Sequence, residues 1–160
     1  MLKNKSFISS IRHAVKGFYD ALKREKNLRF HVITGNLICF FAAHFGITRI
    51  EWGLLLIIIC MVITCEVINS AIEKTVDTAT HNMRADAMHA KDFAAAATLV
   101  TAIFAVLVGI VLFADLKKII NALVSIFTSP VSLIILGILT FINIKIILIN
   151  TRRNYERKKI

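Results

Sequence analysis

The sequence predicts an all-α, integral-membrane helical bundle, and three observations support this fold class. Hydrophobic residues make up 57% of the 160 residues, more than a soluble domain of this length usually carries. Only one proline and six glycines interrupt the chain, which favours long helices over short strands. One basic amphipathic segment is followed by four apolar segments, and the mean hydropathy is +0.71. We therefore expect helices with lipid as their solvent.

The N-terminal segment, residues 6–29, is expected to form an amphipathic helix that lies in the membrane interface. Apolar residues recur there at helical spacing, and lysines and arginines occupy much of the other face. The apolar stripe consists of Phe7, Ile11, Ala14, Phe18 and Leu22. The alternative is a helix packed on a soluble core, but no soluble core follows in the sequence.

The four apolar segments are expected to cross the membrane, at about residues 32–47, 52–73, 93–114 and 131–149. The third carries no charge and is long enough to span the hydrocarbon. We therefore expect a membrane domain over residues 1–114 and an extension over residues 115–160, with a fourth span and a basic tail. Three cysteines, Cys39, Cys60 and Cys65, lie in apolar segments and form no CxxC pair, so neither a disulfide framework nor a zinc site is supported.

The distribution of basic residues predicts the orientation of these spans. Eight of the 20 lysines and arginines precede His31, and five lie in the last ten residues. The two loops on the other side hold only Arg49 and the pair Lys117 and Lys118. The positive-inside rule then places the N-terminus, the loop 74–92 and the tail in the cytoplasm. Basic clusters beside apolar runs indicate anionic lipid headgroups, not nucleic acid, as the partner.

A stripe of polar residues continues the second span at its cytoplasmic end. Glu66, Asn69, Glu73 and Asp77 recur at i, i+3, i+7 and i+11, which places them within roughly 80° on one helix face. A carboxylate near the bilayer centre costs about 2.5–3.5 kcal/mol on insertion scales, so a deep acid is expected to have a function. Three simpler readings stay open: a structural hydrogen bond for Glu66, an interfacial charge for Glu73 and a solvated or capping role for Asp77.

Two depths on one helix face suggest two chemical roles. Glu66 lies about 10 Å deeper than Glu73 at helical rise, and a carboxylate in low dielectric is suited to accept a proton from a lipid hydroxyl. The shallow Glu73 can reach water, magnesium and nucleotide phosphates. Magnesium prefers one or two carboxylates plus phosphate oxygens, and Glu25, at a similar depth, is the second acid that we expect. Lys91 and Asp92, before the third span, add a cation where phosphate could be held.

At these residues the sequence resembles the prokaryotic diacylglycerol kinase family, which includes the undecaprenol kinases. The matching pieces are Lys16-Gly17, the block from Glu25 to His31, Glu66-Val67-Ile68-Asn69-Ser70-Ala71-Ile72-Glu73, Val76-Asp77 and Ala90-Lys91-Asp92. The resemblance covers about residues 10–114, and the Glu-x-x-Asn-Ser-Ala-Ile-Glu block is its most specific part. The fourth span is additional to the family's three.

The resemblance implies a lipid kinase of the bacterial cytoplasmic membrane that uses Mg²⁺ and ATP. It also implies a homotrimer of three-span protomers with active sites shared between neighbours. Glu66 matches the family's proposed base, and Glu25 and Glu73 match the residues that hold the metal with ATP. Asn69, Lys91 and Asp92 match residues of the nucleotide and phosphate region, with which we group Asp77 because it shares the acidic face.

The expected reaction is phosphorylation of a membrane lipid alcohol, and two alcohols are considered. The form of the block from Glu25 to His31 resembles the undecaprenol kinases more than the diacylglycerol enzymes, so undecaprenol is the preferred substrate and diacylglycerol the alternative. A non-catalytic membrane subunit or small cation transporter is a third reading. It explains the acidic stripe but not the grouping of Glu25 with Lys91 and Asp92 at one face, which phosphoryl transfer requires.

Overall fold

The fold was analysed in a computed structural model that describes residues 7–79 and 85–149. Every regular element in these two ranges is an α-helix. The helices are α1 (Phe7–Arg24), α2 (Lys26–Phe45), α3 (Arg49–Ala79), α4 (Ala85–Leu112), α5 (Leu116–Thr128) and α6 (Pro130–Leu148). Four of them, α2, α3, α4 and α6, are long and apolar enough to cross a membrane. The predicted all-α membrane bundle is therefore confirmed.

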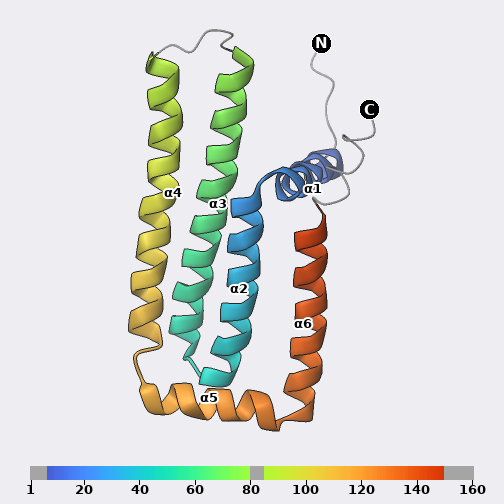
Figure 1. The fold of residues 1–160 in the computed structure, drawn as a ribbon, viewed down its shortest axis with the longest axis vertical. Helices are drawn as coiled ribbons and strands as arrows, with labels where there is room; N and C mark the ends of the chain where they lie inside the picture. Colours follow the sequence, from blue (N-terminus) through green and yellow to red (C-terminus); the bar gives the residue numbers. More distant parts are fainter. Residues whose placement is uncertain (1–6, 80–84, 150–160) are drawn as a thin grey trace.

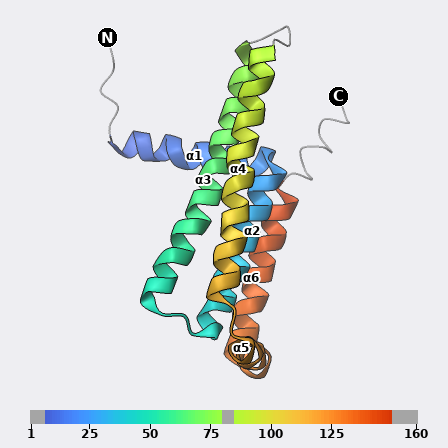
Figure 2. The same cartoon turned by 90° about the vertical axis from the view of Figure 1, so that its left-hand side faces the viewer.

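The four long helices run up and down beside one another, and the two amphipathic helices cross their ends. α1 lies across the bundle where α2 begins, and α5 lies across the opposite end (Figures 1 and 2). α3 and α4 pair along their length and extend past the level of α1 (Figure 1). The charged first turns of α4 and last turns of α3 thus stand beyond the apolar part of the bundle.

The N-terminal helix is shorter than predicted, because the chain turns at Glu25. Glu25 has an extended backbone (φ −99°, ψ 112°), so α1 ends at Arg24 and not at residue 29, and α2, the helix that contains the first expected span, begins at Lys26. The turn is stabilised by Arg29, whose guanidinium donates to the carbonyl of Leu22 at 2.8 Å and to that of Lys23 at 3.3 Å. These carbonyls belong to the last turn of α1, which has no helical partner for them. The periodicity of the sequence does not predict a contact that comes from the next helix.

A helix that we did not predict, α5, occupies the connection between the third and fourth spans. Asp115 caps its start and accepts a hydrogen bond from the Lys118 amide at 3.0 Å. Its 13 residues are too few to cross the hydrocarbon, and it buries Ala122 and Ile126 against the bundle end. The expected loop is thus an amphipathic helix that lies across the spans.

The fourth span, α6, is bound to α2 by polar contacts inside the apolar bundle. The Asn36 amide donates to Oδ1 of Asn143 at 3.2 Å, and the His44 ring lies 2.9 Å from the Ser132 hydroxyl. Asn143 and Ser132 are both buried. In lipid, such hydrogen bonds help to choose which helix faces meet. α6 therefore packs against α2 and α5 as an addition to the first three spans.

Close contact between α2 and α3 depends on Gly35. A β-carbon at Gly35 would lie 3.0 Å from Cγ2 of Ile59, tighter than an ordinary van der Waals contact. A glycine at this crossing lets the two backbones approach, as small residues do in membrane helix pairs. This approach brings the start of α2 beside the polar stripe of α3.

Candidate active site

The inner part of the polar stripe of α3, Glu66 and Asn69, is buried where α2, α3 and α4 meet, whereas Glu73 is half-buried and Asp77 is exposed. Glu66 is 3% exposed and Asn69 is 8% exposed, although both are polar. The Asn69 amide donates to Oε1 of Glu73 at 3.2 Å, one turn nearer the protruding end of α3. Glu66, Asn69 and Glu73 thus follow one another along one face, as their spacing predicted.

Glu66 and Asn69 line a polar pocket of about 390 Å³. The other walls come from α2 and α4, and the complete lining is Asn27, Phe30, His31, Glu66, Asn69, Ala95, Thr98, Leu99 and Ala102. The small residues of α4 leave this space open. The pocket can accept a small polar group, such as a lipid hydroxyl, beside a buried carboxylate.

Two hydrogen-bond acceptors in this pocket are available to a ligand. Oδ1 of Asn69 is buried and has no hydrogen-bond partner among residues 7–79 and 85–149. Within the same residues, the Glu66 side chain forms neither a hydrogen bond nor an ion pair, although the Ser70 hydroxyl donates to its backbone carbonyl at 2.9 Å. A buried polar atom without a partner is costly, so a donor from a bound molecule would be stabilised here.

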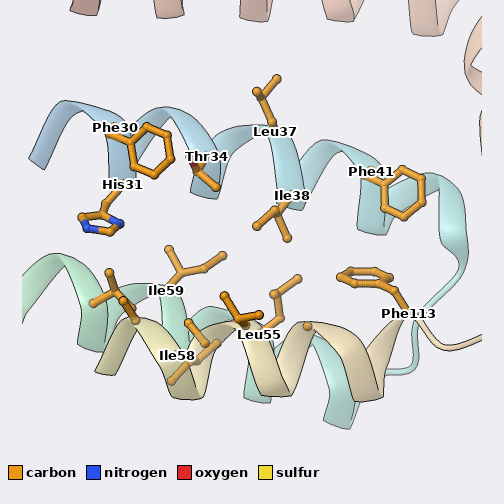
Figure 3. A pocket seen from close by; sticks show the side chains of 15 residues that line it. Phe30, His31, Thr34, Leu37, Ile38, Phe41, Leu55, Ile58, Ile59 and Phe113 are labelled. Atoms are coloured by element: carbon orange, nitrogen blue, oxygen red, sulfur yellow. The ribbon is translucent and has the colours of Figure 1, made fainter. Parts of the chain in front are cut away.

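An apolar groove of about 580 Å³ adjoins the polar pocket (Figure 3). It is lined by the aliphatic and aromatic side chains of α2, α3 and α4, which include Leu37, Ile38, Leu55, Ile58, Ile59 and Val62. At its far end Phe113 meets Phe41 with ring centroids 5.4 Å apart. Phe30, His31 and Ala102 line both spaces, so the groove leads into the pocket that holds Glu66.

Ion pairs connect the charged ends of the helices near this pocket. Lys91 of α4 lies 2.8 Å from Asp77 of α3, and Lys74 of α3 lies 3.3 Å from Glu25 at the turn between α1 and α2. Each of these two ion pairs thus joins residues from different elements. Asp92 is exposed, and no hydrogen bond or ion pair joins it to another residue in the described ranges.

We predicted no role from the sequence for three residues of this region. Lys74 pairs with Glu25, Arg29 stabilises the turn that carries Glu25, and His31 lines both spaces. Arg29 and His31 lie in the motif that starts at Glu25, which was a signal that the whole block has a function. The carbonyls that Arg29 contacts, however, belong to another helix, α1.

The comparisons with known proteins cover the residues that form this site. The family model of prokaryotic diacylglycerol kinase matches residues 12–113, which include the polar pocket, the groove and both ion pairs. The chain belongs to the prokaryotic diacylglycerol kinase family. It is 35% identical over 109 residues to a protein named undecaprenol kinase from Bacillus subtilis, covering 67% of this chain and 87% of the relative. It is 34% identical over 105 residues to a protein named diacylglycerol kinase from Synechocystis, covering 65% of this chain and 60% of that relative. No solved structure matches the chain significantly.

Family membership identifies the chain as a multi-pass membrane lipid kinase, an enzyme of ATP-dependent phosphoryl transfer. The alternative interpretation, a non-catalytic membrane subunit or small cation transporter, is therefore not supported. The matched region ends at residue 113, and α5 and α6 lie beyond it. The C-terminal extension is therefore an addition to the family domain.

Proposed function

We propose that this lipid kinase phosphorylates undecaprenol at the cytoplasmic face of the membrane, with Glu66 as the general base. The observation that carries the proposal is the continuity of the apolar groove with the polar pocket, at whose wall Glu66 is 3% exposed. A lipid whose chain lies in the groove presents its hydroxyl to the pocket. The alternative reaction is the phosphorylation of diacylglycerol to phosphatidic acid.

The proposed step is direct transfer of the γ-phosphoryl group. The Glu66 carboxylate accepts the hydroxyl proton, the lipid oxygen forms a bond to the γ-phosphorus, and the bond from that phosphorus to the bridging oxygen breaks to release ADP. General-base catalysis of this kind contributes about 10²–10⁴-fold. The isolation of Glu66 from other hydrogen-bonding groups in the described residues leaves its oxygens available for that proton.

We propose that Glu73 of the polar stripe and Glu25, which lies at the turn between α1 and α2 and pairs with Lys74, hold a magnesium ion together with ATP. The fit rests on the donor set: carboxylate oxygens and the unpaired Oδ1 of Asn69 are the hard oxygen ligands that Mg²⁺ prefers. In the described residues no group of three or more His, Cys, Asp or Glu side chains forms a cage, which is consistent with an ion that takes its other ligands from phosphate and water. The ion would neutralise the charge on the phosphate oxygens during transfer.

We assign nucleotide contacts to Asn69 in the pocket and to Asp77, Lys91 and Asp92 at the protruding ends of α3 and α4. Asp77 lies about 16 Å from Glu66 along the helix, so the nucleotide would extend along α3 toward the base. Lys91 is held beside Asp77 at 2.8 Å, where its ammonium supplies positive charge for phosphate. This assignment rests on the family resemblance together with the α3–α4 pairing.

The proposed orientation places α1, the ends of α3 and α4 and the C-terminal tail in the cytoplasm. Lys16, Lys23 and Arg24 on α1 and the basic tail support it through the positive-inside rule. For the assembly, we adopt the homotrimer that the family resemblance implies. Large apolar side chains exposed along α4, such as Phe104, Leu107 and Val111, require lipid or neighbouring copies to cover them.

The preference for undecaprenol is supported by the lining of the groove. The α3 wall consists of Leu55, Ile58, Ile59 and Val62, which offer no donor to the ester carbonyls of diacylglycerol, so only Thr34 and His31 of α2 could pair with them in the groove. An unpaired buried carbonyl costs about 1–3 kcal/mol, or up to about a hundredfold in discrimination. A polyprenol has no such carbonyls. The two named relatives, one of each activity, have similar identity to this chain and do not favour either lipid.

The test is transfer of labelled phosphate from ATP by purified protein in mixed micelles. Undecaprenol and diacylglycerol, present at equal surface concentration, give the ratio of specificities directly, and a ratio above one for diacylglycerol would reverse the substrate choice. Glu66→Gln should bind nucleotide but lose turnover by two or more orders of magnitude. The matched control is Glu51→Gln, an acid at the opposite end of α3 that pairs with the Thr48 amide. Near-normal turnover of Glu66→Gln would refute its role as the base.

A further inference from the structure

His31 is the polar side chain at the junction of the two spaces. Three residues line both the groove and the pocket, and of these Phe30 and Ala102 have apolar side chains. Figure 3 shows the His31 ring at one end of the groove, beyond the aliphatic side chains of α2 and α3. A lipid whose chain lies in the groove and whose hydroxyl lies in the pocket would therefore have this imidazole beside it.

The position of His31 is determined by its neighbours on α2. Leu28 is fully buried and Arg29 is 8% exposed, and Arg29 is bonded to the last turn of α1. One turn after His31, Gly35 allows α2 to contact Ile59 of α3 closely. The rotation of α2 about its axis is thus held on both sides of His31, which directs the ring toward the junction.

The imidazole has hydrogen-bonding capacity that the protein does not use. Its ring contacts the edge of Phe30, with centroids 5.6 Å apart, but forms no hydrogen bond with any residue that the structure describes. A neutral imidazole always carries one N–H donor and one acceptor nitrogen. His44, lower on the same helix, instead has both ring nitrogens near partners, Phe40 and Ser132.

We propose that His31 recognises the lipid by donating a hydrogen bond to its oxygen at the groove mouth, and so positions the hydroxyl beside Glu66. This inference rests on the proposed function. For a polyprenol the acceptor is the hydroxyl oxygen itself; for diacylglycerol an ester carbonyl can take the same place. Asn27 lines only the polar pocket and Thr34 only the groove, so neither can serve at the junction.

The test compares His31→Phe, which keeps a ring but removes both nitrogens, with His31→Gln, which keeps an N–H donor. We expect His31→Phe to raise the lipid KM about tenfold, the upper range for one neutral hydrogen bond, with the ATP KM unchanged. His31→Gln should recover most of that loss. An unchanged ATP KM reports that the variant is folded; if His31→Phe does not accumulate, His31→Leu gives the same comparison. The matched control, His44→Phe, removes a histidine from the same helix outside both spaces and should leave the lipid KM as it is.

The two lipids distinguish which oxygen is bound. Equal losses for undecaprenol and diacylglycerol would assign the bond to the hydroxyl, and a larger loss for diacylglycerol would add its ester carbonyl as an acceptor, whereas an unchanged KM for undecaprenol would overturn the inference for a polyprenol. An unchanged lipid KM in His31→Phe, or a His31→Gln as poor as His31→Phe, would overturn the inference. Equilibrium binding of tritiated undecaprenol or diacylglycerol without ATP supplies a second readout. If the wild type transferred no phosphate to either lipid, the proposed function would fail, and the binding comparison would still test His31.

Discussion

The contact between Gly35 and Ile59 offers a sharp test of how α2 is placed. A β-carbon at Gly35 would lie 3.0 Å from Cγ2 of Ile59, and valine adds two methyl groups to it. Overpacking of this kind costs about 1–3 kcal/mol. Valine has a higher helix propensity than glycine, by about 0.5 kcal/mol, and this difference offsets part of that cost. We therefore expect Gly35→Val to be destabilised by about 0.5–2.5 kcal/mol.

The same substitution should reduce activity, because α2 carries His31 toward Glu66. A misplacement of about 1 Å at a reacting centre can cost about a hundredfold, so a shift of a few tenths should cost about tenfold in kcat/KM for the lipid. The assays are unfolding in mixed micelles with increasing SDS and the micelle kinase assay. Gly137→Val is the control, because a β-carbon there has no atom within 4 Å. If Gly35→Val unfolded at the same SDS fraction as Gly137→Val and kept its activity, the close α2–α3 contact would be wrong.

Three further predictions concern the proposed magnesium ligands and the C-terminal extension. Glu73→Gln and Glu25→Gln should each raise the magnesium concentration required for half-maximal rate, unlike Glu66→Gln, and superimposable magnesium titrations would remove the metal role. Asn143→Leu should leave Asn36 unpaired and loosen α6 by about 0.6–1.7 kcal/mol in SDS unfolding, with kinase activity retained because α6 lies beyond the family domain. A cysteine at Tyr155, in a chain without native cysteines, should resist impermeant thiol reagents applied to intact cells, whereas rapid labelling from outside would contradict a cytoplasmic tail.

Properties that depend on local helical geometry could be predicted from the sequence. The spans were expected from runs of apolar residues, and residues 7–79 and 85–149 contain four helices of sufficient length and hydropathy. The order of Glu66, Asn69 and Glu73 along one face follows from their spacing alone, since any helix places residues three, four and seven apart on one side. The amphipathic helix of the N-terminal segment could be predicted for the same reason, and α1 lies across the bundle (Figure 2).

Two features were not predicted from the sequence, for different reasons. The turn at Glu25 contains neither glycine nor proline, and it is stabilised by Arg29 from the following helix. α5 was missed because its 13 apolar and polar residues are too few for a span and were read as a loop. A search for spans does not detect a short helix that lies across the ends of others.

The sequence by itself determined that this protein is helical, membrane-embedded and acidic along one face of its second span, because these properties follow from hydrophobicity and the 3.6-residue period. Only the tertiary structure decided what that face meets. The pairing of Asp77 with Lys91, of Glu25 with Lys74 and of Asn36 with Asn143 joins residues distant along the chain. The junction of groove and pocket at His31 likewise depends on how closely α2 crosses α3 and on the small side chains of α4. Helix crossings and the space left between side chains are set by packing among several elements, which no local period encodes.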